Sequence, residues 1–164
     1  MMELYLLRHA DAGDPMTWDG PDDDRPLSDK GERQADRLGR FLAACGFRPD
    51  AILTSPRVRA AETARIVGER LDIRARVDAR LAGELSPDVV EALLRDAGDP
   101  ERVVLVGHDP DFSDLVAELC GAAQIPMRKC ALARIDSARP LAPGAGTLRW
   151  LVPPDLLKGF RADD

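Results

Sequence analysis

Short apolar runs alternate with amphipathic helical patterns along most of this chain, and this alternation restricts the folds open to it more than any other feature. Apolar runs typical of strands occupy residues 4–7, 51–54, 73–77, 103–107, 131–135 and 147–152. Helical patterns lie between them, at about 30–45, 56–71, 87–97 and 112–119. This order predicts an α/β fold, a single-domain α/β/α sandwich with a mainly parallel central sheet and room for an antiparallel edge.

Three expected helices carry a start signal. Ser55-Pro56 and Ser86-Pro87 each place a serine at the N-cap and a proline at the first helical position. Asp29, with Glu32 three residues on, resembles a capping box. These signals predict where the chain turns from loop into helix.

The length and charge of the chain limit its organisation and its partners. A chain of 164 residues fits one domain, covering residues 1–164, of which only the tail after Pro154 looks peripheral. Its formal net charge of −6 argues against general attraction to nucleic acid or to an anionic membrane surface. Any anion that it binds must therefore be held by a local cluster of cations.

The sequence also predicts the compartment. The apolar stretch at 4–7 lacks the basic region and the cleavage site of a signal peptide, and no apolar run approaches the roughly 20 residues that span a bilayer. Cys45, Cys120 and Cys130 form no CxxC pair, which disfavours both a disulfide framework and a cysteine zinc site. We therefore expect a soluble cytoplasmic protein with free thiols.

The chain has two histidines, and each directly follows an apolar strand run. His9 comes after the run at 4–7 and Arg8, and His108 comes after the run at 103–107. In open α/β sheets, ligands bind in the crevice beyond the carboxyl ends of the strands. The two imidazoles are therefore predicted to converge on one site.

Several arginines stand close to these positions in the sequence pattern. Strand alternation places Arg8 and His9 on opposite faces, so only a turn at the strand end lets both reach one ligand. Arg57 and Arg59 fall in the first turn expected after Ser55-Pro56, where the helix dipole disfavours a cation unless an anion is bound. Arg59 is therefore a candidate phosphate clamp, whereas the role of Arg57 stays open.

Four motifs resemble the histidine phosphatase superfamily in their order and spacing, and specifically its short SixA-type phosphohistidine phosphatases. They are LLRHA at 6–10, RPLSDKG at 25–31, TSPRVRAAETA at 54–64 and VLVGHDP at 104–110. The motif-bearing core covers about residues 2–121. Ala10 stands where most of the superfamily has glycine, and SixA-type members often have alanine there. The resemblance implies a phosphoglycerate mutase-like fold.

The resemblance also implies roles for individual residues. His9 would be the nucleophile and would carry a transient phosphohistidine, while Arg8, Arg59 and His108 would surround the transferred phosphoryl group. Arg25 matches a SixA-type arginine beside the pocket and would contact phosphate or a phosphopeptide. The arrangement requires neither a metal ion nor another cofactor.

The sequence offers several candidates for the group that protonates the leaving atom. In larger superfamily members a glutamate after the third strand has this role, and Glu84 is the nearest candidate. The carboxylates of Asp22, Asp23 and Asp24 are alternatives, or they only solvate their loop. A phosphohistidine substrate could instead supply the proton from its own ring, so a dedicated acid is not required.

These features together predict a phosphatase that acts on phosphohistidine of a protein. Larger relatives enclose small phosphometabolites under insertions, and a chain this short has little to spare for such a lid. The alternatives are a phosphatase of small phosphomonoesters or nucleotides, a phosphate-binding module without turnover, and a metal-dependent hydrolase using His9, His108 and residues 22–24.

Overall fold

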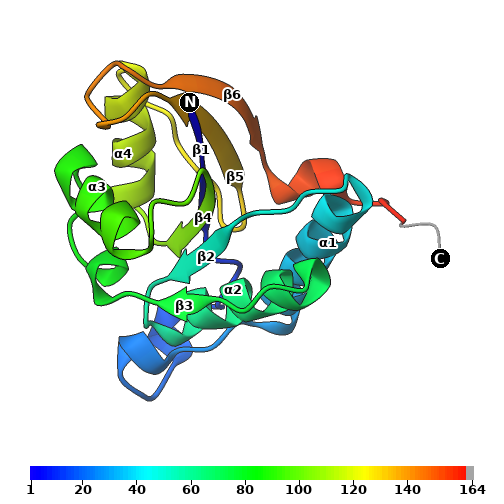
Figure 1. Ribbon diagram of the computed structural model, residues 1–164. Helices are drawn as coiled ribbons and strands as arrows, with labels where there is room; N and C mark the ends of the chain where they lie inside the picture. Colours follow the sequence, from blue (N-terminus) through cyan, green and yellow to red (C-terminus); the bar gives the residue numbers. More distant parts are fainter. Residues whose placement is uncertain (162–164) are drawn as a thin grey trace.

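Strand β1 (Met2–Arg8) lies inside a six-stranded sheet with the strand order β3-β2-β4-β1-β5-β6 (Figure 1). The computed structural model describes residues 1–161. The other strands are β2 (Ala51–Thr54), β3 (Arg76–Val77), β4 (Arg102–Gly107), β5 (Leu132–Ser137) and β6 (Thr147–Val152). Strands β3, β2, β4 and β1 are parallel, whereas β5 and β6 add antiparallel strands at one side. The predicted mainly parallel sheet with an antiparallel edge is confirmed.

Four helices cover the two faces of this sheet (Figure 1). Helices α1 (Asp29–Ala44) and α2 (Val58–Leu71) pack on one face, together with the 3-10 turn η4 (Pro154–Leu157). Helices α3 (Pro87–Asp96) and α4 (Asp111–Cys120) pack on the other. The molecule is therefore the expected α/β/α sandwich, and none of its helices within residues 1–161 is long and apolar enough to cross a bilayer.

Side-chain alternation along β1 divides the core into two layers. Leu4 and Leu6 are buried with the residues of α3 and α4, whereas Tyr5 and Leu7 are buried with those of α1 and α2. Both faces of β1 are thus covered, as the continuous apolar run at 4–7 requires. This burial fixes the register of β1, and with it the place of His9 at its end.

Several helix and strand boundaries in the structure differ from those expected from the sequence. Strand β3 covers only Arg76–Val77, because the backbone N–H of Ile73 instead donates to Gly68 O and closes the end of α2. Ser28 rather than Asp29 is the N-cap of α1, accepting from Gly31 N. Pro154 and Leu157 are buried, so the start of the tail that looked peripheral in the sequence packs on the core, while residues 162–164 of that tail lie outside the described residues.

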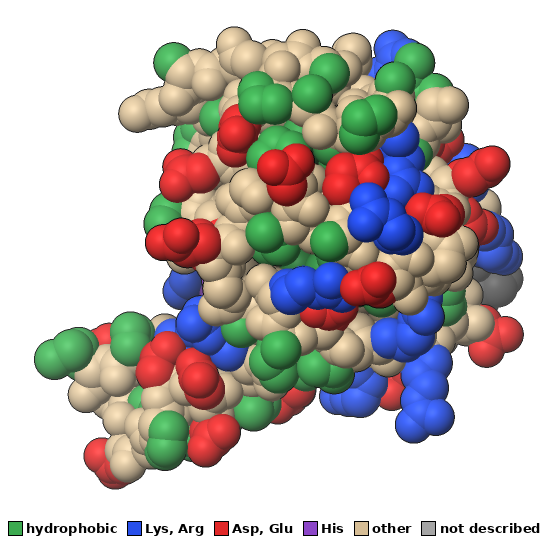
Figure 2. Space-filling model, turned by 60° about the vertical axis from the view of Figure 1, so that its left-hand side comes forward, with side chains coloured by type: hydrophobic (Ala, Val, Ile, Leu, Met, Phe, Trp, Pro, Cys, Tyr) green, Lys and Arg blue, Asp and Glu red, His purple; other side chains and the backbone are tan. Residues whose placement is uncertain are grey.

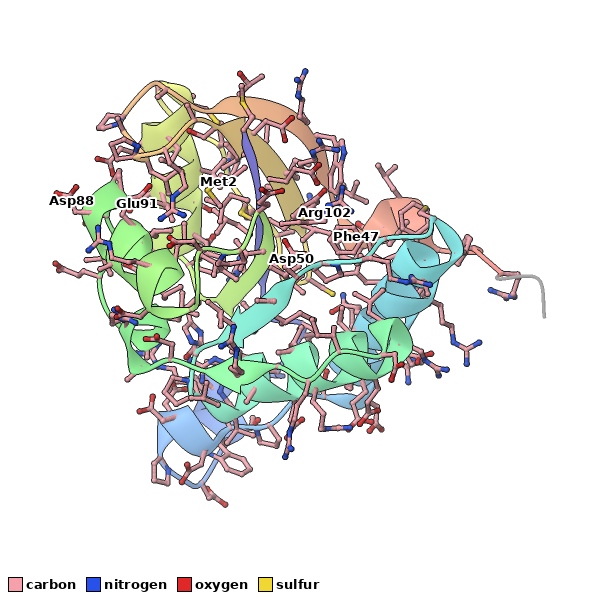
Figure 3. All side chains as sticks on the ribbon, viewed as in Figure 1. Met2, Phe47, Asp50, Asp88, Glu91 and Arg102 are labelled. Atoms are coloured by element: carbon pink, nitrogen blue, oxygen red, sulfur yellow. The ribbon has the colours of Figure 1, made fainter. Side chains whose placement is uncertain are left out.

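Charged residues at the amino-terminal edge of the sheet pair with one another. Arg102, the first residue of β4, donates to the Glu3 carboxylate at 2.7 Å, and the Asp50 carboxylate accepts from Arg102 N at 2.8 Å (Figure 3). The Arg134 guanidinium completes this group with ion pairs to Glu3 and Asp136. These charges are paired within the protein, so this edge offers no set of unpaired cations among them for a ligand.

Candidate active site

The two histidines meet at the carboxyl-terminal edge of the sheet. Arg8 of β1 is in register with Gly107 of the neighbouring parallel strand β4, so the residues that follow each strand leave the sheet side by side. His9 N continues the pairing by donating to Gly107 O at 2.9 Å. The ring centroids of His9 and His108 are 5.3 Å apart, and both side chains are buried. The structure therefore brings together the two imidazoles that the strand ends single out.

The hydrogen bonding of His9 fixes its tautomer. Its Nδ1 lies 2.7 Å from the carbonyl oxygen of Ala10, which can only accept, so Nδ1 carries the hydrogen. Burial lowers the pKa of His9 to about 4, and the nearby charges of Arg59 and Arg8 act in the same direction. At neutral pH the ring is therefore uncharged, with a free lone pair on Nε2.

His108 is also held neutral. Burial lowers its pKa to about 3, assisted by the proximity of His9, Arg57 and Arg59. Its Nε2 lies 2.7 Å from the hydroxyl oxygen of Ser55. Its Nδ1 is buried without a hydrogen-bond partner among the described residues. One ring nitrogen is thus anchored by the protein, and the other is left for a ligand.

Ser55 does not cap helix α2, so that prediction is wrong. The helix begins at Val58 with Arg57 at the N-cap, and no side chain caps it. The Ser55 hydroxyl instead accepts from Arg57 N at 3.2 Å and meets the His108 ring. The same dipeptide at Ser86-Pro87 does form the expected cap, with Ser86 accepting from Val89 N. Ser55 follows β2 directly, and this strand-end position was the signal of its role.

Arg59 lies at the second position of α2 and is buried. Its Nη1 donates to Asp22 O at 2.8 Å, and its Nη2 donates to the Asp22 carboxylate at 3.1 Å. Its Nε has no partner within the described part of the chain. Burial lowers the pKa of this guanidinium, although Asp22 opposes the shift. Arg59 is therefore oriented by Asp22 while one donor stays open.

Arg8 reaches the same site from the end of β1. Its Nη1 donates to Met127 O at 2.8 Å and lies 3.4 Å from the Asp109 carboxylate. Its Nε is buried and unpartnered among residues 1–161. The charge of Arg8 also contributes to the lowered pKa of both His9 and His108. Arg8 therefore belongs to the group of cations that surrounds the two rings.

Arg25 is placed beside the site rather than inside it. Its Nη1 donates to Ala12 O at 2.7 Å, and its Nε donates to the Asp22 carboxylate at 3.2 Å. Arg25 is buried, and these bonds tie the 11–27 loop to itself. The loop projects from the body as a lobe with acidic and hydrophobic side chains on its surface (Figure 2). A direct phosphate contact by Arg25 would have to replace at least one of these bonds.

The acidic turn η2 (Asp22–Asp24) supplies counter-charges to the arginines. Asp22 pairs with Arg25 and Arg59, and Asp23 pairs with Arg57 at 3.1 Å. Hydrogen bonding from Arg25 lowers the pKa of Asp22, so this carboxyl is ionised at neutral pH and has no proton to donate. Asp22 therefore orients the arginines and is a poor candidate for the general acid.

Glu84 is exposed and follows the 3-10 turn η3 (Ala79–Ala82). No hydrogen bond or ion pair joins Glu84 to either histidine in the part of the chain that the structure describes. Burial of Asp111, the first residue of α4, raises its pKa, the charge of Glu84 acts in the same direction, and the charge of Arg57 opposes both. Asp111 stands three residues after His108 and lies outside the four sequence motifs.

The site leaves an unusual set of donors open. Nε of Arg57 is buried without a hydrogen bond of good geometry, but it lies 3.1 Å from the Asp23 carboxylate. Among residues 1–161, the other buried side-chain nitrogens without hydrogen-bond partners are Nε of Arg8, Nε of Arg59 and Nδ1 of His108. Buried polar atoms are normally paired, so each of these is an exception that requires a ligand or water. No group of His, Cys, Asp or Glu residues within the described range is arranged to hold a metal ion. The open donors therefore fit an anion.

A separate hollow lies away from the histidines. It has a volume of about 680 Å³ and is lined by Thr54 of β2 and by residues of α2 and the following segment, from Ala61 to Val77. It offers none of the open donors described above. The open donors are therefore found at the strand ends and not in this hollow.

Solved structures of similar shape identify the architecture. The protein histidine phosphatase SixA, solved as a complex with tungstate, matches with a TM-score of 0.81 at 28% identity, over 95% of this chain and 99% of that one. The mostly parallel six-stranded sheet of this chain, flanked by helices, thus has the expected phosphoglycerate mutase-like fold.

Sequence comparison then gives the family. The profile of the Histidine phosphatase superfamily (branch 1) matches residues 4–97, and the chain belongs to this superfamily. Phosphohistidine phosphatase SixA of Escherichia coli is 29% identical over 98% of this chain and 99% of its own length. An uncharacterised protein of the cyanobacterium Picosynechococcus is 37% identical over 69% of this chain and 70% of its own length. The chain is therefore a phosphatase of the histidine phosphatase superfamily.

Proposed function

We propose that this phosphatase removes phosphoryl groups from phosphohistidine on proteins, through a phosphohistidine that forms transiently on its own His9. The observation that carries the proposal is the state of His9. Its ring is neutral, its Nδ1 hydrogen is held by Ala10 O, and its Nε2 lone pair is free beside buried donors that lack partners. A neutral imidazole with one fixed tautomer is a nucleophile suited to phosphorus.

In the proposed reaction, His9 Nε2 attacks phosphorus while the bond from phosphorus to the substrate imidazole breaks. Water then attacks phosphorus, breaks the bond to His9 and releases inorganic phosphate. The charge spreads over the equatorial oxygens in both steps, where Arg8, Arg59 and His108 would stabilise it with their open donors. Ser55 would donate to His108 Nε2 and so leave a hydrogen on Nδ1 for a phosphoryl oxygen.

The leaving imidazole needs a proton only if its ring is not already protonated on the other nitrogen. A protonated phosphohistidine leaves as a neutral ring without an enzymic acid. For substrates with a poorer leaving group, Asp111 is the carboxyl group that we propose as proton donor, because burial and the nearby charge of Glu84 raise its pKa. We therefore assign any general-acid role to Asp111, with Glu84 beside it, and not to Asp22 of the η2 turn, whose pKa is lowered.

Similarity along the full length of E. coli SixA supports a protein substrate over a small one. The Arg8 side chain is 23% exposed, so the site communicates with the surface. The runner-up is a phosphatase of small phosphomonoesters, since the same open donors would hold any phosphoryl group.

Trapping of the covalent intermediate tests the proposal. A ³²P-phosphohistidine protein is mixed with the enzyme and quenched without acid, and the labelled residue is mapped. Wild type should carry a base-stable, acid-labile phosphate on His9, and His9→Ala should carry none and lose turnover. His108→Ala keeps the nucleophile and should turn over slowly with some label. Label on His108, or substantial turnover by a folded His9→Ala enzyme, would overturn the mechanism.

A further inference from the structure

A second pocket lies directly beside Arg8, on the side of the site away from the acidic η2 turn. It has a volume of about 310 Å³ and is lined by the start of α1, by the loop before β5 and by η4. Arg8 lines this pocket and directly precedes His9 at the end of β1, so the pocket adjoins the strand end that carries the proposed phosphoryl site. A group held here would belong to the same substrate molecule.

The lining of this pocket is strongly cationic for a protein of net charge −6. Its charged residues are Arg8, Lys30, Arg128 and Lys129, facing the carboxylates Asp11 and Asp155.

Both carboxylates in the lining already have partners. The Asp11 carboxylate accepts from the Ser28 hydroxyl at 2.6 Å and pairs with Lys129 at 3.3 Å. The Asp155 carboxylate lies 3.6 Å from Arg128 and 3.3 Å from Lys158, so it is shared by two cations. Lys30 has no ion pair among the described residues. The pocket therefore retains uncompensated positive charge.

We propose that this pocket binds a second anionic group of the substrate, which on a phosphoprotein is an Asp or Glu side chain next to the phosphohistidine. The inference rests on the proposed function. The two sides of the site differ in charge, since the aspartates of η2 lie on the α2 side and the cations of the pocket lie on the α1 side. This asymmetry gives the substrate one preferred direction across the site.

The test compares phosphohistidine peptides that differ at one neighbouring residue, Glu or Gln. For wild type, we expect kcat/KM to be about tenfold higher for the Glu peptide than for the Gln peptide, because KM is lower for the Glu peptide. This preference should decrease as salt is added. The double variant Lys30→Gln/Arg128→Gln should lose this preference and keep the kcat for the Gln peptide. Arg33→Gln removes one exposed charge from the same helix outside the pocket and should keep the preference.

A small-molecule arm separates this inference from the proposed function. Phenyl phosphate and 4-carboxyphenyl phosphate are compared in the same three enzymes. A carboxylate preference that depends on Lys30 and Arg128, without hydrolysis of any phosphohistidine peptide, would retain the second-anion pocket and overturn the proposed substrate. Equal kcat/KM for both members of each pair in wild type would overturn the proposal that this pocket binds a second anionic group. An unchanged preference in the double variant would overturn it as well.

Discussion

At the scale of single residues, the site owes its chemistry to nitrogens that the fold leaves unpaired. His9 and His108 each use one ring nitrogen in a bond to the protein, at Ala10 O and at Ser55. Arg8 and Arg59 likewise use their terminal nitrogens on the protein and keep Nε open. Each side chain is thus oriented before a ligand arrives, which is the condition for electrostatic stabilisation without reorganisation.

The pH dependence follows from the lowered histidine pKa values. Because His9 has a pKa of about 4, the acid limb of kcat/KM should fall near pH 4 and not near pH 6.5. A stable aryl phosphate is the suitable substrate, since phosphohistidine hydrolyses in acid. Loss of half the activity at pH 6.5 would show that His9 is not held neutral.

The same shifts affect stability. The unfolded chain binds protons on both histidines near pH 6.5, whereas the folded chain does so only near pH 4 and 3. The free energy of unfolding should therefore decrease as pH falls from 6.5 toward 4. Urea unfolding at pH 7.5 and 5 should show a smaller decrease for His9→Gln/His108→Gln, which keeps every carboxylate. Equal decreases would contradict the assignment.

Arg59→Ala should lower turnover by at least about a hundredfold, because it removes a preoriented cation from the phosphoryl group. The matched control is Arg65→Ala, an exposed arginine of the same helix that pairs with Glu69. The control should keep near-normal kcat, and both variants should show normal circular dichroism. A folded Arg59→Ala enzyme with wild-type kcat would show that Arg59 does not contribute to turnover.

At the scale of elements, the start of α1 clamps the base of the projecting lobe. Ser28 N donates to Asp11 O at 2.9 Å, and Gly31 lies so close to Asp11 that a Cβ at this position would overlap the Asp11 carbonyl oxygen. The two ends of the 11–28 segment therefore meet at this helix turn. The lobe that carries Asp22 to Arg59 is held from its base by a glycine contact.

Gly31→Ala should destabilise the fold by about 1–3 kcal/mol, because the loop and helix must separate to admit a methyl group. Arg33→Ala, exposed on the same helix, should change the free energy of unfolding by less than about 0.5 kcal/mol. Urea denaturation measures both. A Gly31→Ala variant more stable than wild type, as helix propensity alone would predict, would contradict the close contact.

Comparison of elements shows what the sequence could predict. Apolar runs located the strands, and the strand-end rule placed His9 and His108 together, because both depend on local periodicity and parallel topology. Ser86-Pro87 was interpreted correctly as a helix start and Ser55-Pro56 was not, although the local signal is the same. The difference lies in a partner distant in sequence, His108, which local patterns do not reveal. Asp111 and the Arg59–Asp22 contact depend on tertiary packing in the same way.

At the scale of the whole molecule, the two edges of the sheet differ in their open donors. Both edges pair arginines with carboxylates, Arg102 with Glu3 at the amino-terminal edge and Arg59 with Asp22 at the carboxyl edge. Among the described residues, the buried nitrogens without hydrogen-bond partners belong to the carboxyl edge. In a protein of net charge −6, an anionic substrate is therefore held by these local donors and not by an overall field.

Activity should persist in excess chelator, because the proposed mechanism assigns the stabilisation of charge to Arg8, Arg59 and His108. Turnover of an aryl phosphate is measured before and after incubation with EDTA and after addition of divalent ions. A chelator-treated enzyme that recovers activity only when Mg²⁺ or Zn²⁺ is restored would support the metal-dependent alternative.

The interior position of β1 has a consequence for biosynthesis. The strand that presents His9 is synthesised before its two neighbours, β4 and β5, which pair with it from Arg102 and Leu132 onward. On the ribosome, a nascent chain that ends before β4 has no neighbouring strand to pair with the strand that carries His9. The apolar run of β1 therefore stays unpaired until β4 and β5 have been synthesised. The strand of the proposed nucleophile is thus made early and becomes ordered late.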